Sequence, residues 1–165
     1  MTKSIDDLKA GFAGESQANR KYTAFARKAD AEGYSQVARL FRAAAAAETV
    51  HALNHFRVLG GVKTTRENLE AAIAGENYEV VTMYPEFIQD AEAEGNKAAL
   101  HSFKDAWAVE KIHEQLYREA LATLGQTTET FDYYVCPVCG YTVAKSAPER
   151  CPVCSTPGNK FEHVV

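Results

Sequence analysis

The first 135 residues of this 165-residue chain contain no cysteine, and all four cysteines lie between positions 136 and 154. Exported proteins stabilised by disulfides distribute their cysteines more widely, so a disulfide framework is not expected. The sequence also lacks an apolar run near the roughly 18 residues that a membrane span needs, and it does not open like a signal peptide. These absences predict a cytoplasmic protein with no membrane partner.

Positive charge is in deficit, because 18 Lys and Arg residues stand against 22 Asp and Glu residues, a formal net charge of −4. Domains that bind nucleic acid usually carry a basic surface, so a nucleic-acid partner is not expected. No G-x-G-x-x-G motif follows an expected strand, so the chain is not expected to bind a nicotinamide cofactor itself. The 46% hydrophobic content is typical of a globular protein with a core.

Four helical segments are expected between residues 4 and 125, because apolar residues recur there at three- and four-residue steps between cap signals. Pro85 lies inside the third segment and is expected to interrupt and kink it. The first helix is predicted to run from Ser4, its N-cap, to Glu32, and the second from its N-cap Ser35 to about Gly60. The third is predicted to begin at a capping box of Thr64 and Glu67 and to end before Gly95, and the fourth to end near Gly125.

The helical region contains an internal repeat. AGES at 13–16 recurs as AGEN at 74–77, AEG at 31–33 recurs at 93–95, and ETVH at 48–51 recurs as EKIH at 110–113. The offset stays at 61 to 62 positions, so we infer a duplicated helix pair. Two helix pairs packed together make a four-helix bundle, so the expected fold class is mainly α.

Each helix carries a glutamate near the middle of its apolar stripe. An ionised carboxylate buried without a partner costs several kcal/mol, and the stripes contain no lysine or arginine. Two of these glutamates belong to Glu-x-x-His motifs, which place both side chains on one helix face. A single Glu-x-x-His motif would be better explained as a pair of solvent-exposed surface residues. Four glutamates in apolar stripes, two of them in such motifs, instead predict a pair of metal ions held by carboxylates and imidazoles. The residues are Glu15, Glu48 with His51, Glu76, and Glu110 with His113.

A second metal site is predicted after the polar linker at 125–130, where two C-x-x-C pairs occur. A segment of about 35 residues is too short to form a stable hydrophobic core unless a disulfide or a bound metal ion stabilises it. Four thiolates form a tetrahedral site for iron or zinc, and spacing alone slightly favours zinc. An adjacent di-iron pair favours iron, because zinc is redox-inert and cannot relay electrons.

These features together resemble the rubrerythrin family, and the resemblance covers nearly the whole chain. It rests on GFAGESQANRKY at 11–22, ETVH at 48–51, AIAGENYE and MYPEF within 72–87, EKIH at 110–113, and CPVCGY with APERCPVC within 136–154. It implies a mainly α fold, a ferritin-like four-helix bundle over 1–128, followed by a small rubredoxin-like metal-binding module over 131–165.

The resemblance also implies the ligands and their neighbours. Glu48 and Glu110 match the bridging carboxylates, and Glu79 matches a ligand that one iron holds when oxidised and exchanges for His51 when reduced. Glu79 has no counterpart in the first half, where Ala18 stands. Tyr22 and Tyr84 match tyrosines that hydrogen-bond ligand carboxylates; Tyr22 follows Glu15 by seven positions, as a helix requires, whereas Tyr84, beside Pro85, fits an ideal helix less well. The implied set is two non-haem irons on Glu15, Glu48, His51, Glu76, Glu79, Glu110 and His113, and one iron, or alternatively zinc, on Cys136, Cys139, Cys151 and Cys154.

The implied activity is that of a peroxidase in oxidative stress defence, which reduces hydrogen peroxide to water. An external NAD(P)H-dependent reductase or a rubredoxin supplies electrons through the Fe(Cys)4 centre, an NADH peroxidase activity overall. Two alternatives stay open, a ferroxidase and a zinc-ribbon interaction protein on a helical scaffold. The connection at 60–65 is shorter than in many family members, which predicts a homodimer that exchanges helix pairs, with the cysteine module of one chain near the di-iron site of the other.

Overall fold

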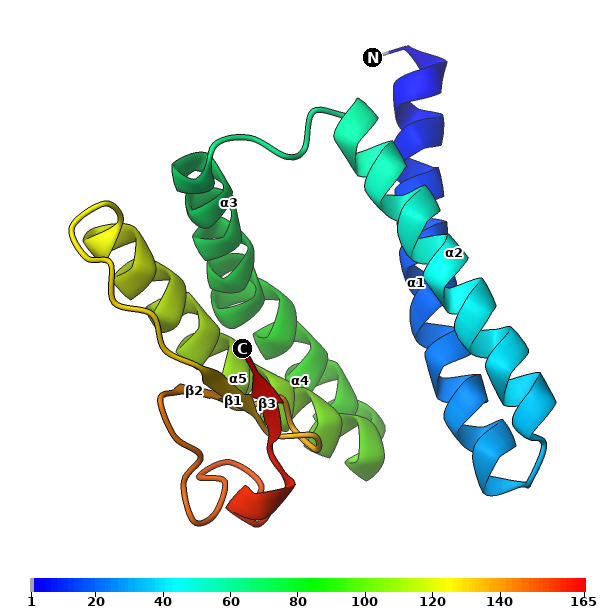
Figure 1. Ribbon diagram of the computed structural model, residues 1–165. Coiled ribbons are helices and arrows are strands. Elements are labelled where there is room, and N and C mark those ends of the chain that lie inside the picture. Colours follow the sequence, from blue (N-terminus) through cyan, green and yellow to red (C-terminus); the bar gives the residue numbers. More distant parts are fainter. Residues whose placement is uncertain (1) are drawn as a thin grey trace. The chain divides into compact units, whose positions relative to one another are not determined.

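The computed structural model describes residues 2–165 (Figure 1). The chain divides into two compact units, one ending at Lys63 and the other beginning at Thr64. In the part of the chain that is described, no helix is both long and apolar enough to cross a membrane. The elements are α1 (Lys3–Ala31), α2 (Ser35–Val58), α3 (Thr65–Tyr78), the π-helical turn η1 (Glu79–Met83), α4 (Tyr84–Glu94), α5 (Lys97–Thr123), β1 (Tyr133–Val135), β2 (Thr142–Ala144), the 3-10 turn η2 (Gly158–Lys160) and β3 (Glu162–Val164).

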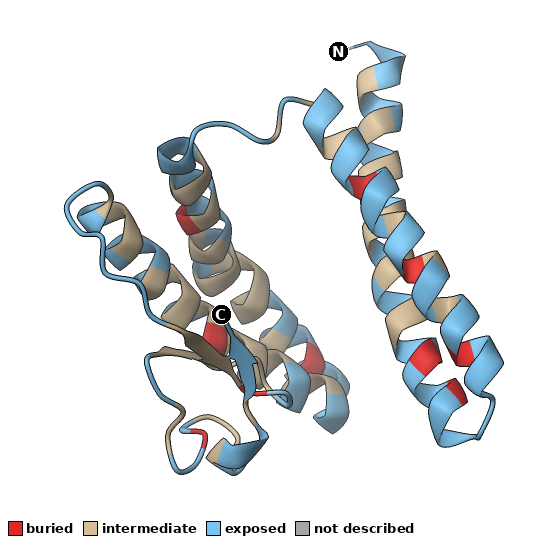
Figure 2. Cartoon of the chain, in the orientation of Figure 1, coloured by how far each residue is buried: buried red, intermediate tan, exposed pale blue. Residues whose placement is uncertain are grey.

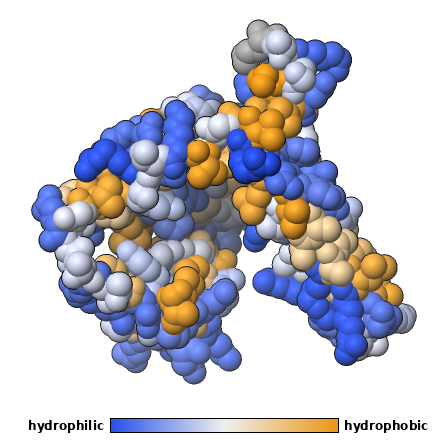
Figure 3. Space-filling view, turned by 45° about the horizontal axis from the view of Figure 1, so that its top comes forward, coloured by the Kyte–Doolittle hydropathy of each residue, from blue (hydrophilic) through white to orange (hydrophobic). Residues whose placement is uncertain are grey.

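The first unit is a hairpin of α1 and α2. Gly33 ends α1 with a left-handed φ of +83°, a conformation that glycine adopts without steric cost. The buried positions of this hairpin are all alanines, whose small side chains let the two helices approach closely (Figure 2); they are Ala26, Ala29, Ala38, Ala45 and Ala52. Large apolar side chains stay accessible instead, with Leu40 65% and Leu53 59% exposed. Apolar groups are accordingly visible on the molecular surface (Figure 3).

In the second unit α3, η1 and α4 pack along α5, with Ile73, Ala91 and Val109 buried. The predicted capping box is confirmed at the start of α3, where Thr64 Oγ1 accepts from the Glu67 amide and the Glu67 carboxylate accepts from the Thr64 amide. The pair α3–α5 therefore repeats the first hairpin, as the duplication predicts.

Two of the predicted N-caps are wrong. Thr2 and Tyr34, not Ser4 and Ser35, precede α1 and α2. The backbone explains the shift, because the Thr2 carbonyl already accepts from the Ile5 amide at 3.0 Å and the Tyr34 carbonyl already accepts from the Ala38 amide at 3.0 Å. Ser4 and Ser35 consequently lie inside the first helical turn.

The irregularity expected at Pro85 is present, but it is the π-helical turn η1 just before the proline. The Tyr84 amide bonds back to the Glu79 carbonyl, and Pro85 has no amide hydrogen, so the Val80 carbonyl lacks a main-chain donor. Trp107 on α5 fills this role, since its Nε1 donates to the Val80 oxygen at 2.8 Å. The wide turn is thus stabilised by the helix that packs against it.

The cysteine module contains a three-stranded antiparallel sheet with β1 between β2 and β3. Figure 1 shows this sheet beside α5, and both belong to the second unit. This packing positions the module against α5, the helix that carries Glu110 and His113.

Candidate metal centres

The first half-site is formed by one residue of α1 and two of α2. His51 Nδ1 lies 3.0 Å from Glu48 Oε2 and 3.8 Å from Glu15 Oε1. One donor atom from each residue lies within 4.8 Å of the others. The three-residue step from Glu48 to His51 places both on one face of α2, so the hairpin alone assembles these three donors.

The second half-site repeats this arrangement on α3 and α5. His113 Nδ1 lies 2.8 Å from Glu110 Oε2 and 3.9 Å from Glu76 Oε1, and the three donors again lie within 4.8 Å of one another. The side chain of His113 is 27% exposed, whereas that of His51 is 54% exposed. The two halves therefore share their donors but differ in how firmly the histidine is enclosed.

The electrostatics of the second half-site suit a cation. Burial, and then the neighbouring charge of Glu110, raise the pKa of Glu76 to about 7. Burial and Glu110 also raise the pKa of Glu79, and the hydrogen bond to Glu110 raises the pKa of His113 although burial opposes it. Crowded carboxylates beside an imidazole form the donor set that iron prefers, and a bound cation relieves their mutual repulsion. The residues present therefore fit a di-iron centre.

Glu79 lies in η1, outside the tight three-donor group but within the electrostatic reach of Glu110. Tyr84 is also within electrostatic reach of these carboxylates, because burial and then the charges of Glu110, Glu79 and Glu76 raise its pKa. Tyr84 follows Glu76 by eight positions, one more than Tyr22 follows Glu15, and the wider π turn accommodates the extra residue. The misfit of Tyr84 to an ideal helix is thereby explained.

Two other aromatic residues complete this description. The Tyr22 ring packs near the rings of Phe25 and Phe41, at centroid distances of 6.3 and 6.2 Å. Within residues 2–165, Tyr22 makes no hydrogen bond to a predicted ligand. Tyr117 was not predicted as a site residue, yet burial and the charges of Glu76 and Glu110 raise its pKa. Its position four residues after His113, in the apolar stripe of α5, was the available sequence signal.

The four cysteines converge as predicted. Cys136 Sγ lies 3.5 Å from Cys154 Sγ, Cys139 Sγ lies 3.5 Å from Cys151 Sγ, and all four sulfur atoms lie within 4.8 Å of one another. Ligands about 2.3 Å from a tetrahedral metal ion are about 3.8 Å apart, whereas disulfide sulfurs are about 2 Å apart. The distances fit a metal site and not a pair of disulfides.

Both C-x-x-C segments form the same knuckle. The Cys136 amide donates to the Tyr141 carbonyl at 2.9 Å, and the Cys151 amide donates to the Thr156 carbonyl at 2.8 Å. The residue after each second cysteine is left-handed, with φ of +86° at Gly140 and +63° at Ser155. The two knuckles therefore present their cysteines to a common centre by equivalent backbone paths.

The thiols differ in their tendency to ionise. Burial raises the pKa of Cys139 well above its ordinary value. Burial also opposes ionisation of Cys154, but hydrogen bonds from the hydroxyl and amide of Thr156, and then from the other cysteines, outweigh it and lower the pKa of Cys154 to about 6. A bound cation favours the thiolate form of every ligand, so metal binding at this site is expected to release protons.

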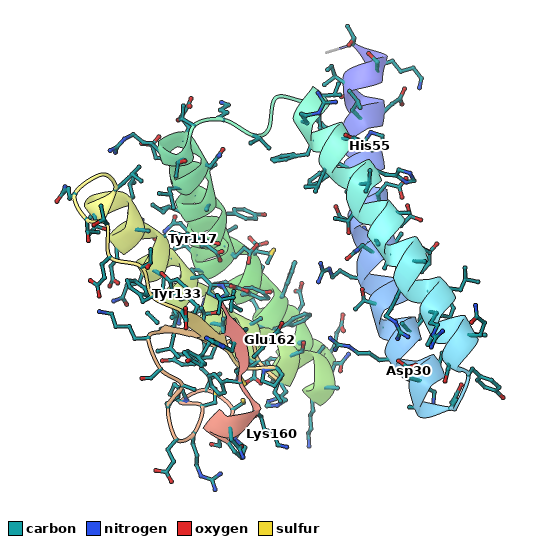
Figure 4. The ribbon with its side chains drawn as sticks, viewed as in Figure 1. Asp30, His55, Tyr117, Tyr133, Lys160 and Glu162 are labelled. Atoms are coloured by element: carbon teal, nitrogen blue, oxygen red, sulfur yellow. The ribbon has the colours of Figure 1, made fainter. Side chains whose placement is uncertain are left out.

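The cysteine module contacts the second half-site of its own chain. Thr142 Oγ1 on β2 lies 3.0 Å from His113 Nε2, and a Cβ placed on Gly140 would lie 3.8 Å from Val109 on α5. Tyr117 of α5 and Tyr133 of β1, labelled in Figure 4, line a cavity of about 310 Å³ beside this contact. The structure shows the module against a half-site of the same chain, and the predicted proximity to the di-iron site of a partner chain stays a prediction.

Paired helices with carboxylate–imidazole half-sites, followed by a four-thiolate module, define the di-iron carboxylate class of proteins. Comparisons with known proteins agree. Residues 6–121 match the family model for rubrerythrin, and residues 134–162 match the model for the rubrerythrin rubredoxin-like domain. The chain therefore belongs to the rubrerythrin family, a group of di-iron, peroxidase-like oxidoreductases.

Individual relatives cover nearly the whole chain. Nigerythrin of Nitratidesulfovibrio vulgaris is 36% identical, over 96% of this chain and 85% of that protein. Rubrerythrin of Porphyromonas gingivalis is 38% identical, over 98% of this chain and 93% of that protein. A solved structure of nigerythrin in its fully reduced, all-ferrous state matches with a TM-score of 0.60 and 34% identity, over 99% of this chain and 87% of that one. These findings confirm the mainly α fold class, the rubredoxin-like module and the two kinds of metal site.

Proposed function

We propose that the chain is a non-haem di-iron peroxidase that reduces hydrogen peroxide to water. An external NAD(P)H-dependent reductase or a rubredoxin supplies the electrons, which pass through the Fe(Cys)4 centre. The observation that carries this proposal is the 3.0 Å contact between Thr142 of the cysteine module and His113 of the second half-site. A hydrogen bond between the module that would hold one redox centre and a ligand of the other centre supports electron transfer between them.

We also propose that the chain comprises a di-iron domain over 1–128 and a rubredoxin-like domain over 131–165. We further propose that all of the predicted ligands bind the metal ions. Two bound irons would supply the electrons and the Lewis acidity for cleavage of the O–O bond. Glu48 and Glu110 are the proposed bridging ligands, and Glu79 and His51 are the proposed alternative ligands of one iron. A hard carboxylate suits the oxidised ion, and a neutral imidazole suits the reduced ion.

Reduction of one peroxide to two waters consumes two electrons and two protons, so the site needs proton donors. The Tyr84 and Tyr117 phenols keep their Oη protons at neutral pH, because burial and the nearby carboxylates raise their pKa values. We propose that Tyr84 and Tyr22 assist the reaction by hydrogen bonds to ligand carboxylates.

We propose a homodimer in which helix pairs are exchanged, so that each centre combines half-sites of two chains. Each half-site supplies only three tightly grouped donors, and a pair of irons needs more. The exposed apolar side chains of the first hairpin, among them Leu40 and Leu53, give such an exchange a surface to bury. A monomer in light scattering that still held two irons at carboxylates and turned over peroxide would contradict this proposal.

The activity is tested by metal analysis, optical spectra and peroxide consumption with NADH, a reductase and rubredoxin. We expect three irons per chain, a colour that bleaches on reduction, and consumption of peroxide at the expense of NADH. Cys136→Ser should abolish this turnover, although a pre-reduced sample should still consume a stoichiometric amount of peroxide once. The control is Ser146→Ala, an exposed position in the same module. Colourless, zinc-containing protein would support the interaction module, and Fe(II) oxidation without peroxide turnover would support the ferroxidase.

A further inference from the structure

Thr142 makes two hydrogen bonds, and together they determine which atom is the donor in each. Its Oγ1 lies 3.0 Å from the Gly140 carbonyl oxygen and 3.0 Å from His113 Nε2. A carbonyl oxygen can only accept, and a threonine hydroxyl has one hydrogen to donate. The hydroxyl therefore donates to Gly140 and accepts from the imidazole.

The imidazole of His113 must then carry its hydrogen on Nε2. The other ring nitrogen, Nδ1, then faces the carboxylates, where Glu110 lies at 2.8 Å and Glu76 at 3.9 Å, and a bound metal ion would take the place of the hydrogen that Nδ1 shares with Glu110. A metal-binding histidine needs this protonation pattern, because the ligating nitrogen must be free of hydrogen.

We propose that Thr142 is a positioning residue, which holds His113 with Nε2–H directed at the cysteine module and Nδ1 directed at the carboxylates. The domain that carries the cysteines thus orients a ligand of the carboxylate centre. This inference rests on the metal centre of the proposed function but not on peroxide reduction.

The other half of the repeat has no equivalent restraint within residues 2–165. The side chain of His51 is 54% exposed, and its hydrogen bond involves Nδ1 and Glu48, with no bond to Nε2. The 27% exposed His113 is bonded on both nitrogens. His113 is therefore held at both ring nitrogens, whereas the described contacts of His51 involve Nδ1 alone.

The test uses the full chain with iron in the cysteine site and Co(II) titrated into the carboxylate site. Thr142→Val keeps the shape of the side chain but removes the hydroxyl, and Thr142→Ser keeps the hydroxyl. Loss of a hydrogen-bond partner of a metal-binding histidine typically weakens metal binding about 10- to 100-fold, and we expect a loss in this range here. The matched control is Thr123→Val, since the Thr123 hydroxyl bonds only the backbone of α5.

Proton NMR of the Co(II) protein reports directly on the Nε2–H group of His113. A general loss of packing would not produce the same change in this resonance. In the wild type, the paramagnetically shifted Nε2–H resonance of His113 should exchange slowly with water. Thr142→Val should lose this slow resonance, and Thr142→Ser should restore both the resonance and the affinity. Unchanged Co(II) affinity together with an unchanged slow resonance in Thr142→Val would overturn the positioning role. A wild-type protein that binds no Co(II) at the carboxylates would overturn the metal centre itself, and peroxide turnover enters neither result.

Discussion

Replacement of Glu76 by glutamine in the metal-free protein tests the electrostatic description of the second half-site. Burial and Glu110 raise the pKa of Glu76 from its ordinary value of 4.5 to about 7. A raised carboxyl pKa stabilises the folded state below the unfolded pKa, and this contribution is lost as the pH rises through the folded pKa. The raised pKa values of Glu79 and His113 act in the same direction. These three groups therefore make the metal-free protein less stable at pH 8 than at pH 5, whereas the lowered pKa of Cys154 acts in the opposite direction.

The magnitude follows from the pKa difference. A shift from 4.5 to about 7, at about 1.4 kcal/mol per pKa unit, has an upper limit of about 3.4 kcal/mol, of which about 2.5 kcal/mol is lost between pH 5 and pH 8. The Glu76 side chain is 18% exposed, so solvent screening reduces this amount, and we expect about 2 kcal/mol. Glu76→Gln keeps the size of the side chain and removes the titration. The variant should therefore lose about 2 kcal/mol less than the wild type over this range.

Urea unfolding of chelator-treated protein, followed by circular dichroism at pH 5 and pH 8, measures both quantities. Glu70→Gln, an exposed position on α3, controls for a general loss of one negative charge. Re-addition of Fe(II) should reverse the trend in the wild type, because bound metal requires the ionised carboxylates that high pH provides. A pH dependence in Glu76→Gln that equals that of the wild type would refute the reasoning.

Two further substitutions test the π turn and the residue that begins it. Glu79→Ala should keep both carboxylate-bound irons but slow peroxide turnover, as iron analysis and steady-state rates would show; normal turnover would make Glu79 a bystander. Trp107→Phe should cost about 1–3 kcal/mol in urea unfolding and speed amide exchange within η1, because the Val80 carbonyl loses its donor. Unchanged exchange in η1 would mean that the turn does not depend on this bond.

The site was predictable wherever ligands follow one another along a helix or lie at equivalent positions of the repeat. The Glu-x-x-His motifs and the duplicated glutamates led directly to both three-donor groups, and the C-x-x-C spacing led to the thiolate group. The π turn also left a trace in the sequence. The repeat offset rises from 61 between Glu15 and Glu76 to 62 between Tyr22 and Tyr84, which marks one inserted residue. Helix caps were less predictable, because several neighbouring residues could begin each helix equally well.

By itself, the sequence determined the four long helical segments, the donors that each contributes and the four-cysteine module. The physical reason is local, because a helix places residues three or four apart on one face and a C-x-x-C turn directs two thiolates to one point. Only the tertiary structure decided that Thr142 meets His113, 29 positions away, and that Trp107 completes the π turn. These contacts join elements whose relative placement depends on packing, and no periodicity within one segment specifies it.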